Sequence, residues 1–172
     1  MVDDGEYNVP IVVMTPVGSG IHGSLYHSHS FDAIMTHLPG WKIVLPSTPI
    51  DTYGRTAPLA AKVATKLGAE GIEVEVIDLR SLWPWDRDMV FESVKKTGRF
   101  VSLNEDVEVT NFGEHIIREV TKECFYHLEA PPTLVAGANT PGIGLAWTLE
   151  AEQVPQDKQI EAALRSVVAT KA

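Results

Sequence analysis

Apolar and polar residues alternate along the chain in two rhythms. Short apolar runs and alternation at every second residue are typical of buried strands. These patterns fall on residues 10–14, 42–45, 72–79, 100–103 and 133–136. Apolar positions spaced three and four residues apart are typical of helices with one buried face. That spacing falls on residues 30–38, 59–67, 87–97, 111–128 and 160–168. Strands that alternate with helices indicate βαβ units, so we predict an α/β fold of three layers with a mainly parallel sheet.

Polar caps and helix-breaking residues locate several helix ends. Asp86 and Asn111 precede helical patterns, and side chains of this type accept a hydrogen bond from the first helical turn. Gly98 lies where a glycine commonly ends a helix. Residues 48–67 begin with Thr-Pro, which predicts a helix start at that point. Residues 137–151 are rich in glycine and proline and predict a loop.

The composition narrows the class of protein. The chain has 172 residues, of which 44% are apolar, as in ordinary globular proteins. Its 14 Lys and Arg against 23 Asp and Glu give a net charge of -9, so we expect no nucleic-acid partner. No apolar run approaches the ~20 residues of a membrane helix, and residues 1–8 do not resemble a signal peptide, so we expect no membrane association. Cys124 is the only cysteine, which excludes an internal disulfide and favours the cytoplasm.

Four of the six histidines fall within a short polar loop and the helix pattern after it: His22, His27, His29 and His37. On an extended segment His27 and His29 would share one face, as in some zinc sites. No cysteine or spaced carboxylate completes such a site, so we expect no metal, and a histidine-rich metal-binding protein stays open as an alternative. The loop follows a predicted strand, where α/β proteins bind ligands, so proton transfer is the second interpretation.

Other motifs have structural interpretations that we favour. Residues 18–23 match G-x-G-x-x-G, but more loop follows instead of a helix, which favours a flexible loop over a dinucleotide site. Glu105 and Asp106 follow a strand pattern and are either acid–base groups or, as we favour, loop or capping residues. The Trp-Pro-Trp sequence at residues 83–85 is expected to seal a strand–helix joint rather than stack on a ligand. Cys124 is expected to be buried in a helix.

Two long stretches of the chain resemble one known family. The first comprises residues 9–13, Gly20, Gly23, and residues 26–33 and 37–49. It resembles the pyrimidine-binding domain of the beta subunits of thiamine-diphosphate-dependent 2-oxoacid dehydrogenases. The second resembles the transketolase-type C-terminal domain of the same subunits. It comprises residues 73–86, 93–99, 111–114 and 130–132. The resemblance implies a partial pyrimidine-binding segment at residues 1–54 and a transketolase C-terminal-like domain at residues 55–172, joined at a Tyr-Gly pair that suits both.

The resemblance also implies a function. The chain resembles the beta subunit, or a shortened relative of it, of an oxidoreductase that decarboxylates pyruvate, a branched-chain 2-oxoacid or acetoin and passes the acyl group to a lipoyl arm. The implied cofactor is thiamine diphosphate with magnesium, bound mainly through an alpha subunit. The implied partners are that alpha subunit and a lipoyl-bearing acyltransferase, in an oligomer. A non-catalytic α/β module for subunit contact is the alternative.

Two departures from the family pattern change the expected activity. Family members begin before Met1, and the glutamate that activates the cofactor lies in that part. They also have a substantial stretch between the pyrimidine-binding domain and the first helix of the second domain. We therefore expect the isolated chain to be inactive.

One residue of the family's active site has a counterpart here. His27 occupies the position of the histidine in the family's His-Ser-Gln motif, and the resemblance implies a catalytic role for it. Ser28 and His29 are the implied neighbours of substrate or cofactor, and His29 stands where the family has Gln. We expect His37, on the predicted helix, to face other residues and to act through stability.

The junction between the two segments predicts a strand pairing. We expect residues 42–45 to replace the first strand of the second domain and to pair in parallel with residues 72–79 through a right-handed crossover. Residues 9–14 would join the same sheet, so both segments would merge into one α/β domain. Without this pairing, the apolar side chains of residues 72–79 would line an uncovered sheet edge. The alternative is a loosely attached N-terminal segment.

Overall fold

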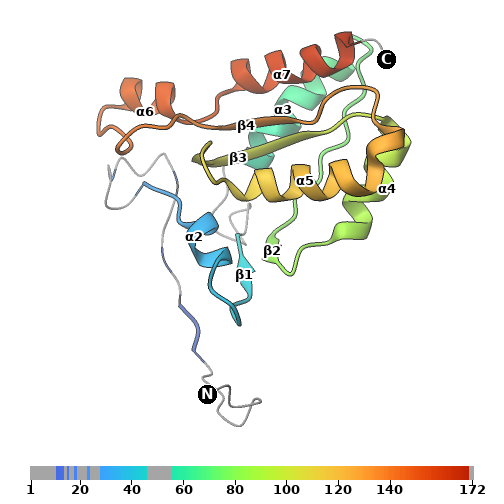
Figure 1. The fold of residues 1–172 in the computed structure, drawn as a ribbon. Helices are drawn as coiled ribbons and strands as arrows, with labels where there is room; N and C mark the ends of the chain where they lie inside the picture. Colours follow the sequence, from blue (N-terminus) through green and yellow to red (C-terminus); the bar gives the residue numbers. More distant parts are fainter. Residues whose placement is uncertain are drawn as a thin grey trace.

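The computed structural model describes residues 11–13, 15, 18, 23, 28–45 and 56–170 (Figure 1). Its elements, in chain order, are α2 (Asp32–Thr36), β1 (Ile43–Val44), α3 (Thr56–Gly68), β2 (Ser81–Trp83), α4 (Arg87–Thr97), β3 (Val101–Val107), α5 (Phe112–Cys124), the 3₁₀ helix η1 (Phe125–His127), β4 (Thr133–Gly137), α6 (Trp147–Gln153) and α7 (Asp157–Ala169). Helices therefore separate most of the strands along the chain, as the hydrophobic pattern predicts.

Two parallel strands form the centre of the described structure. β3 and β4 pair in parallel, with Val101 opposite Thr133 and Leu103 opposite Val135. α3 and α7 cover one face of this pair, and α4 and α5 cover the other (Figure 1). This order of helices, sheet and helices confirms the predicted α/β fold.

Each face of the β3–β4 pair has its own hydrophobic core. The core on the α4–α5 face consists of Leu82, Trp85, Val90, Phe91, Val94, Phe112, Ile116, Val120 and Cys124. The core on the α3–α7 face consists of Val63, Leu67, Val135 and Ile160. Burial raises the pKa of the Cys124 thiol, and the buried position predicted for it is confirmed. All the residues of both cores lie within residues 56–170, so this part of the chain forms its own apolar interior.

The helix ends expected from the sequence are confirmed at three positions. Asp86 Oδ1 accepts a hydrogen bond of 3.0 Å from the Met89 N–H, which caps α4. Gly98 ends the same helix with φ of 68°, a left-handed conformation that favours glycine. Asn111 Oδ1 accepts a hydrogen bond of 2.7 Å from the Gly113 N–H and caps α5. Local polar groups therefore define α4 and the start of α5, independently of the rest of the fold.

The parallel pairing expected for residues 42–45 is wrong. β1 pairs with β2, and the two strands are antiparallel. The ladder continues with a hydrogen bond of 2.6 Å from the Leu45 N–H to the carbonyl oxygen of Arg80. Arg80 has φ of 52°, so the chain turns immediately before β2 and presents β2, rather than residues 72–79, to β1. The N-terminal segment is thus joined to the rest of the chain, but by a different strand.

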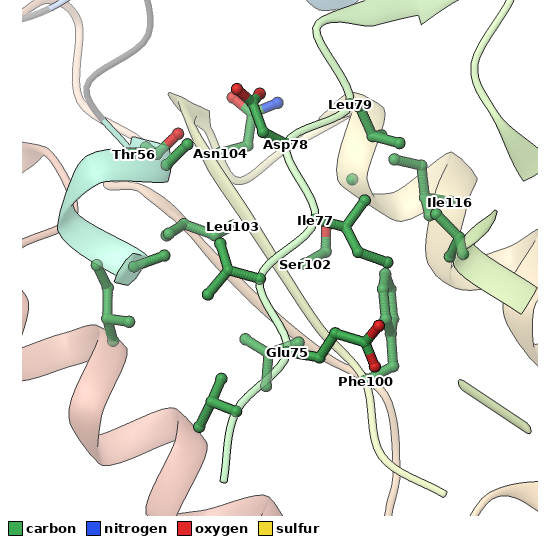
Figure 2. A pocket seen from close by; sticks show the side chains of 18 of the residues that line it. Thr56, Glu75, Ile77, Asp78, Leu79, Phe100, Ser102, Leu103, Asn104 and Ile116 are labelled. Atoms are coloured by element: carbon green, nitrogen blue, oxygen red, sulfur yellow. The ribbon is translucent and has the colours of Figure 1, made fainter. Parts of the chain in front are cut away.

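Residues 72–79 run extended beside β3 without pairing with a described strand, so the strand expected here is also wrong (Figure 2). The alternation of apolar residues in this segment nevertheless corresponds to a division of its side chains between the two cores. Ile72 and Val74 pack against the α3–α7 core, whereas Ile77 and Leu79 pack against the α4–α5 core. A cavity of about 1010 Å³ lies along this segment and β3. The period of two therefore specified which core each side chain contacts, but not the backbone pairing.

Three further boundaries differ from the expectations. A strand is expected at residues 10–14. Residues 11–13 are exposed and form no strand, so this expectation is wrong for these three residues. Residues 10 and 14 lie outside the described residues. The helix start expected at Thr48 also lies outside them, and α3 begins at Thr56. α6 occupies part of the stretch at residues 137–151 that was expected to be a loop. Its large apolar side chains, Trp147 and Leu149, are largely exposed. The helix therefore lacks the periodic buried apolar face by which a helix is recognised in a sequence.

Candidate functional site

The carboxyl ends of β3 and β4 meet the beginning of the N-terminal segment's helix, α2. The last residues of β3 include Asn104, whose Nδ2 donates a hydrogen bond of 2.9 Å to Asp32 Oδ2. β4 ends at Gly137, where a Cβ atom would lie 2.7 Å from the Glu105 carbonyl oxygen, so the two strands pack closely. The carboxyl ends of parallel strands are the usual place for ligands in α/β folds. We therefore take this edge as the candidate site.

Asp32 is the central polar group of the site. Its side chain is buried at the start of α2. Its Oδ1 accepts hydrogen bonds from the Ser30 hydroxyl at 3.2 Å and from the Ala33 N–H at 3.0 Å. Together with the bond from Asn104, these contacts fix the carboxylate between the N-terminal segment and β3.

Asp106 places a second buried carboxyl group against Asp32. Its Oδ1 accepts a hydrogen bond of 2.8 Å from the Val107 N–H. Burial, followed by the hydrogen bond and the negative charge of Asp32, raises the pKa of Asp106 from 3.8 to about 7. Below this pH the pair holds a proton, because two buried carboxyl groups in contact do not readily both ionise. Such a pair can donate or accept a proton near neutrality.

Of the residues assigned from the family resemblance, Ser28 and His29 are described, and His29 lies near this pair. His27 lies outside the described residues, so its catalytic role stays a prediction. Ser28 is fully buried, and its Oγ accepts a hydrogen bond of 2.9 Å from the Gly23 N–H. His29 is half-buried, with its ring centroid 5.5 Å from that of Phe31, and borders a small hollow beside Asp106. The structure therefore brings His29 to the carboxyl pair.

The position expected for His37 is wrong. His37 follows α2 and is exposed, because the short helix ends at Thr36 before the histidine can turn toward the protein. His29 and His37 are the two described members of the histidine group noted in the sequence. Within the described ranges no three metal-ligating side chains come together, and no helix there is long and apolar enough to cross a bilayer.

The carboxyl pair is the part of the site that sequence reasoning missed. Glu105 and Asp106 were singled out as residues that follow a strand, but a loop or capping role was favoured. Both instead belong to β3, and Asp106 is buried. Asp32 was treated as an ordinary helix residue. The only signal in the sequence was the cluster of polar residues at the end of a strand. That cluster does not indicate that Asp32, from a distant part of the chain, lies against Asp106.

A second polar group, His115, is enclosed by aromatic rings. Its ring centroid lies 5.3 Å from that of Phe112 and 6.2 Å from those of Trp83 and Trp85. Burial, then the positive charge of Arg118, lowers the pKa of His115 and favours its neutral form. The rings close the joint between β2 and α4, which confirms the structural interpretation of the Trp-Pro-Trp sequence.

The described residues do not by themselves form a site that fits thiamine diphosphate, the cofactor implied by the resemblance. The hollow beside His29 has a volume of about 10 Å³, enough for about one water molecule. The larger cavity along residues 72–79 is bordered by apolar side chains of both cores, and its walls include Ile77, Leu103 and Ile116 (Figure 2). A diphosphate needs backbone N–H groups or cations around it. The charged residues that line this cavity are mostly carboxylates, which repel a diphosphate: Asp32, Glu73, Glu75, Asp78 and Glu105, against Arg80 and Arg99.

Two family descriptions match the sequence. "Transketolase, C-terminal domain" matches residues 49–160, and "Transketolase, pyrimidine binding domain" matches residues 1–64. The matches overlap at residues 49–64, around the boundary expected at residue 54, which itself stays a prediction. Among solved structures, a "Split gene transketolase, inactive beta4 tetramer" is similar, with a TM-score of 0.57 and 25% identity over 78% of this chain and 44% of that one.

Several characterised proteins are similar over most of the chain. The 2-oxoisovalerate dehydrogenase subunit beta of Bacillus subtilis is 27% identical, over 95% of this chain and 67% of its own length. The acetoin:2,6-dichlorophenolindophenol oxidoreductase subunit beta of Cupriavidus necator is 29% identical, over 95% and 64%. The pyruvate dehydrogenase E1 component subunit beta of Rhizobium meliloti is 28% identical, over 95% and 47%.

The chain thus spans about half to two thirds of the length of these relatives. The alignment with the Bacillus subtilis protein extends over 219 positions, which exceeds the 172 residues of this chain. That relative therefore has residues within the aligned region that this chain lacks. The difference agrees with the departure noted between the two resembling segments.

Proposed function

Since the chain belongs to the transketolase C-terminal domain family and also matches the pyrimidine-binding domain, we propose that it is the beta subunit, or a shortened relative of it, of a thiamine-diphosphate-dependent 2-oxoacid dehydrogenase. Its reaction would be the oxidative decarboxylation of a 2-oxoacid with transfer of the acyl group to a lipoyl arm. One observation carries the proposal: relatives named as beta subunits of three such enzymes each align with 95% of this chain.

The proposal includes the partners of the chain. An alpha subunit would bind thiamine diphosphate with magnesium and would complete the site, since the hollow beside His29 and Asp106 holds only about one water molecule. A lipoyl-bearing acyltransferase would receive the acyl group, and the assembly would be an oligomer. We place it in the cytoplasm, in agreement with the free, buried thiol of its single cysteine.

Within this chain, His27 would act on the substrate or the lipoyl group, with Ser28 and His29 close to it. The hydrogen bond from the Gly23 N–H to Ser28 joins the two ends of the stretch that contains His27. On its other side, Asp32 ties the same loop to β3 through Asn104. These contacts support a site in which the residues flanking His27 are held at the carboxyl end of the parallel sheet.

Titration calorimetry with thiamine diphosphate and magnesium tests whether the alpha subunit binds the cofactor and this chain completes the site. The ligand would be added to this chain, to an alpha-type subunit encoded in the same genome, and to their mixture. The proposal expects negligible binding to this chain and tighter binding to the mixture than to the alpha subunit alone. The contrary outcome is a complex of the alpha subunit and this chain that co-elutes in gel filtration and yet binds the cofactor no more tightly than the alpha subunit alone. That result would favour a non-catalytic module for subunit contact instead.

A further inference from the structure

Two buried carboxyl groups join the N-terminal segment to the C-terminal domain. Asp32 belongs to α2 and Asp106 belongs to β3, and each residue is only 5% exposed. Asn104 bridges the two residues: its Nδ2 donates to Asp32 Oδ2 at 2.9 Å, and its Oδ1 accepts from the Asp106 N–H at 2.8 Å. The neighbouring Asp32 carboxyl group raises the pKa of Asp106. The contact therefore links two parts of the chain that are far apart in the sequence.

Few other interactions hold α2 in place. Ala33 is the one apolar side chain of the helix that is buried, whereas Ile34 is largely exposed. The remaining backbone connection of the segment is the short β1–β2 ladder. Because a helix of five residues is not stable by itself, its position depends on its contacts with β1, β2 and α5 and on the polar contacts of Asp32.

We propose that the Asp32–Asp106 pair is a proton-dependent latch, in which a proton shared by the two carboxyl groups holds residues 28–36 on the end of β3 and its loss releases them. This carboxyl latch concerns the fold of the chain and does not rest on the proposed function. Its direct consequence is that the attachment of the loop after residue 27 varies with pH.

Among the described residues that line the hollow beside Asp106 there is no lysine or arginine, whereas Arg80 lines the larger cavity that Asp32 also borders. His29 and Glu105 are the other titratable groups that border the hollow beside Asp106. The hollow is completed from β4, α6 and their connection by uncharged residues, including Gly137, Thr140 and Gln153. Two ionised carboxylates would therefore face each other, with the half-buried imidazole of His29 at the edge of the same hollow.

Of the elements that contact α2, β1 follows the exposed Lys42, and β2 follows Arg80, which forms an ion pair with Asp78. β1 and β2 contain no charged residue. α5 offers its cap, Asn111, whose Nδ2 donates to the Asp106 carbonyl oxygen at 3.1 Å. In its first turns Glu114 is exposed, and His115 is enclosed by aromatic rings. The second charge is thus opposed mainly by the hydrogen bonds from Asn104, Ser30 and the backbone.

The direction of the pH effect follows from proton linkage. The attached state raises the pKa of Asp106 to about 7, whereas a released, solvated carboxyl group returns to its ordinary value of 3.8. The attached state therefore binds the proton more tightly. Its extra stability is complete below about pH 4 and is lost as the pH rises through about 7. Between pH 5 and 8 the equilibrium constant for release should rise roughly 10- to 100-fold, since each pKa unit corresponds to a factor of ten.

Hydrogen exchange followed by mass spectrometry on the full chain tests the latch. Protection factors, with intrinsic exchange rates divided out, would be compared at pH 5 and pH 8 for peptides covering residues 28–36 and for α5 as the internal reference. We expect protection of residues 28–36 to fall roughly 10- to 100-fold while that of α5 is unchanged. Equal protection of residues 28–36 at both values, or no protection at either, would overturn the proposal.

Two variants separate the latch from a general effect of pH. Asp106→Asn has the shape of the protonated group and can donate to Asp32, so protection should become independent of pH. Glu105→Gln removes a neighbouring carboxylate on the same strand and should keep the pH dependence of the natural protein. The same pH dependence in Asp106→Asn would overturn the latch.

Carbon NMR of the natural protein adds an independent measurement: a titration midpoint near 7 for the Asp106 carboxyl supports the latch, and a midpoint near its ordinary value overturns it.

Discussion

Gly113 lies where the first turn of α5 presses against the parallel strands. A Cβ atom there would lie 2.6 Å from Ser102 Oγ and 2.7 Å from Leu134 Cδ1. We expect Gly113→Ala to destabilise the protein by roughly 1–3 kcal/mol, because the extra methyl group has no space. Gly68→Ala is the matched control: nothing lies within 4 Å, and alanine in a helix should stabilise by about 0–1 kcal/mol. Urea unfolding measures both, and equal shifts of the two variants would contradict the packing described.

His27 is the residue on which the proposed chemistry depends. In an active assembly with an alpha subunit, His27→Ala should lower turnover roughly 10²–10⁴-fold, the usual scale for a general acid–base group. His37→Ala is the control, because that side chain is exposed after α2 and should leave turnover within about twofold of the natural protein. Similar losses of turnover in both variants would remove the distinction between the two histidines.

At the residue scale, the sequence predicted local roles better than pairs across the fold. Asp86, Gly98 and Asn111 act within one helical turn of their own position, so the sequence was sufficient to place them. The contact between Asp32 and Asn104 joins residues 72 positions apart, and no local pattern specifies it. The carboxyl pair was missed for the same reason.

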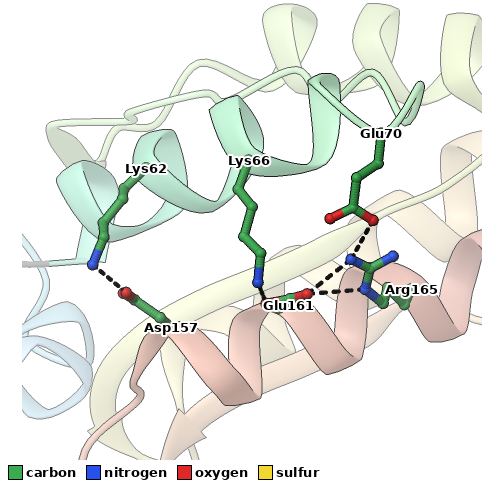
Figure 3. A network of polar contacts seen from close by, with 6 residues as sticks. All are labelled: Lys62, Lys66, Glu70, Asp157, Glu161 and Arg165. Carbon is green, nitrogen blue, oxygen red and sulfur yellow. Dashed lines mark hydrogen bonds and ion pairs between the residues drawn. The ribbon is translucent and has the colours of Figure 1, made fainter.

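At the scale of elements, a row of ion pairs links α3 and the turn after it to α7, with one pair within α7 itself (Figure 3). The pairs are Lys62–Asp157, Lys66–Glu161, Arg165–Glu161 and Arg165–Glu70. Hydrogen bonds from Lys66 and Arg165 lower the pKa of Glu161. Exposed pairs of this kind contribute little singly and are screened by salt.

High salt should therefore reduce the loss of thermal stability caused by removing one of these ion pairs. We expect Lys66→Gln to lower the melting temperature slightly in low salt, and the difference from the natural protein to shrink in about 1 M NaCl, where the screening length falls to about 3 Å. Lys122→Gln, on α5, is the control, because no ion pair of Lys122 with another described residue is seen. Thermal unfolding followed by circular dichroism measures the shifts; a difference that grows with salt would contradict this role.

Strand pairing was the least predictable feature of the elements. The alternation in residues 72–79 coincides with the division of their side chains between the two cores, because alternation is a local property of extended backbone. The partner of β1 depends on the left-handed turn at Arg80, and β1 itself has only two residues. Neither property has a signal in the hydrophobic pattern, so the expected parallel pairing failed. The strands β3 and β4 and the helices other than α6 were predicted.

At the scale of the whole molecule, apolar side chains remain exposed around α2 and the β1–β2 ladder. They include Phe31, Ile34, Leu38, Val44 and Trp83. Exposed apolar patches of this kind usually mark an interface, so we expect self-association or binding to an alpha-type subunit.

Light scattering at tens of micromolar should therefore give a mass clearly above the 18.8 kDa of one chain. Ile34→Lys should lower that mass, because Ile34 is 62% exposed on α2. Met89→Lys is the matched control on α4, where Met89 is 50% exposed, and should leave the mass unchanged. A single chain in solution that also fails to bind an alpha-type subunit would count against the expected interface.

The most direct test of the proposed function is turnover by a reconstituted pair. This chain and the alpha-type subunit of the same genome would be mixed with thiamine diphosphate and magnesium. Reduction of 2,6-dichlorophenolindophenol would be followed with pyruvate, 2-oxoisovalerate or acetoin as substrate. The account predicts substrate-dependent reduction by the mixture and none by this chain alone, because the cofactor site is completed by the partner. Absence of reduction by a stable complex, when the same alpha subunit is active with a full-length beta subunit, would contradict the account.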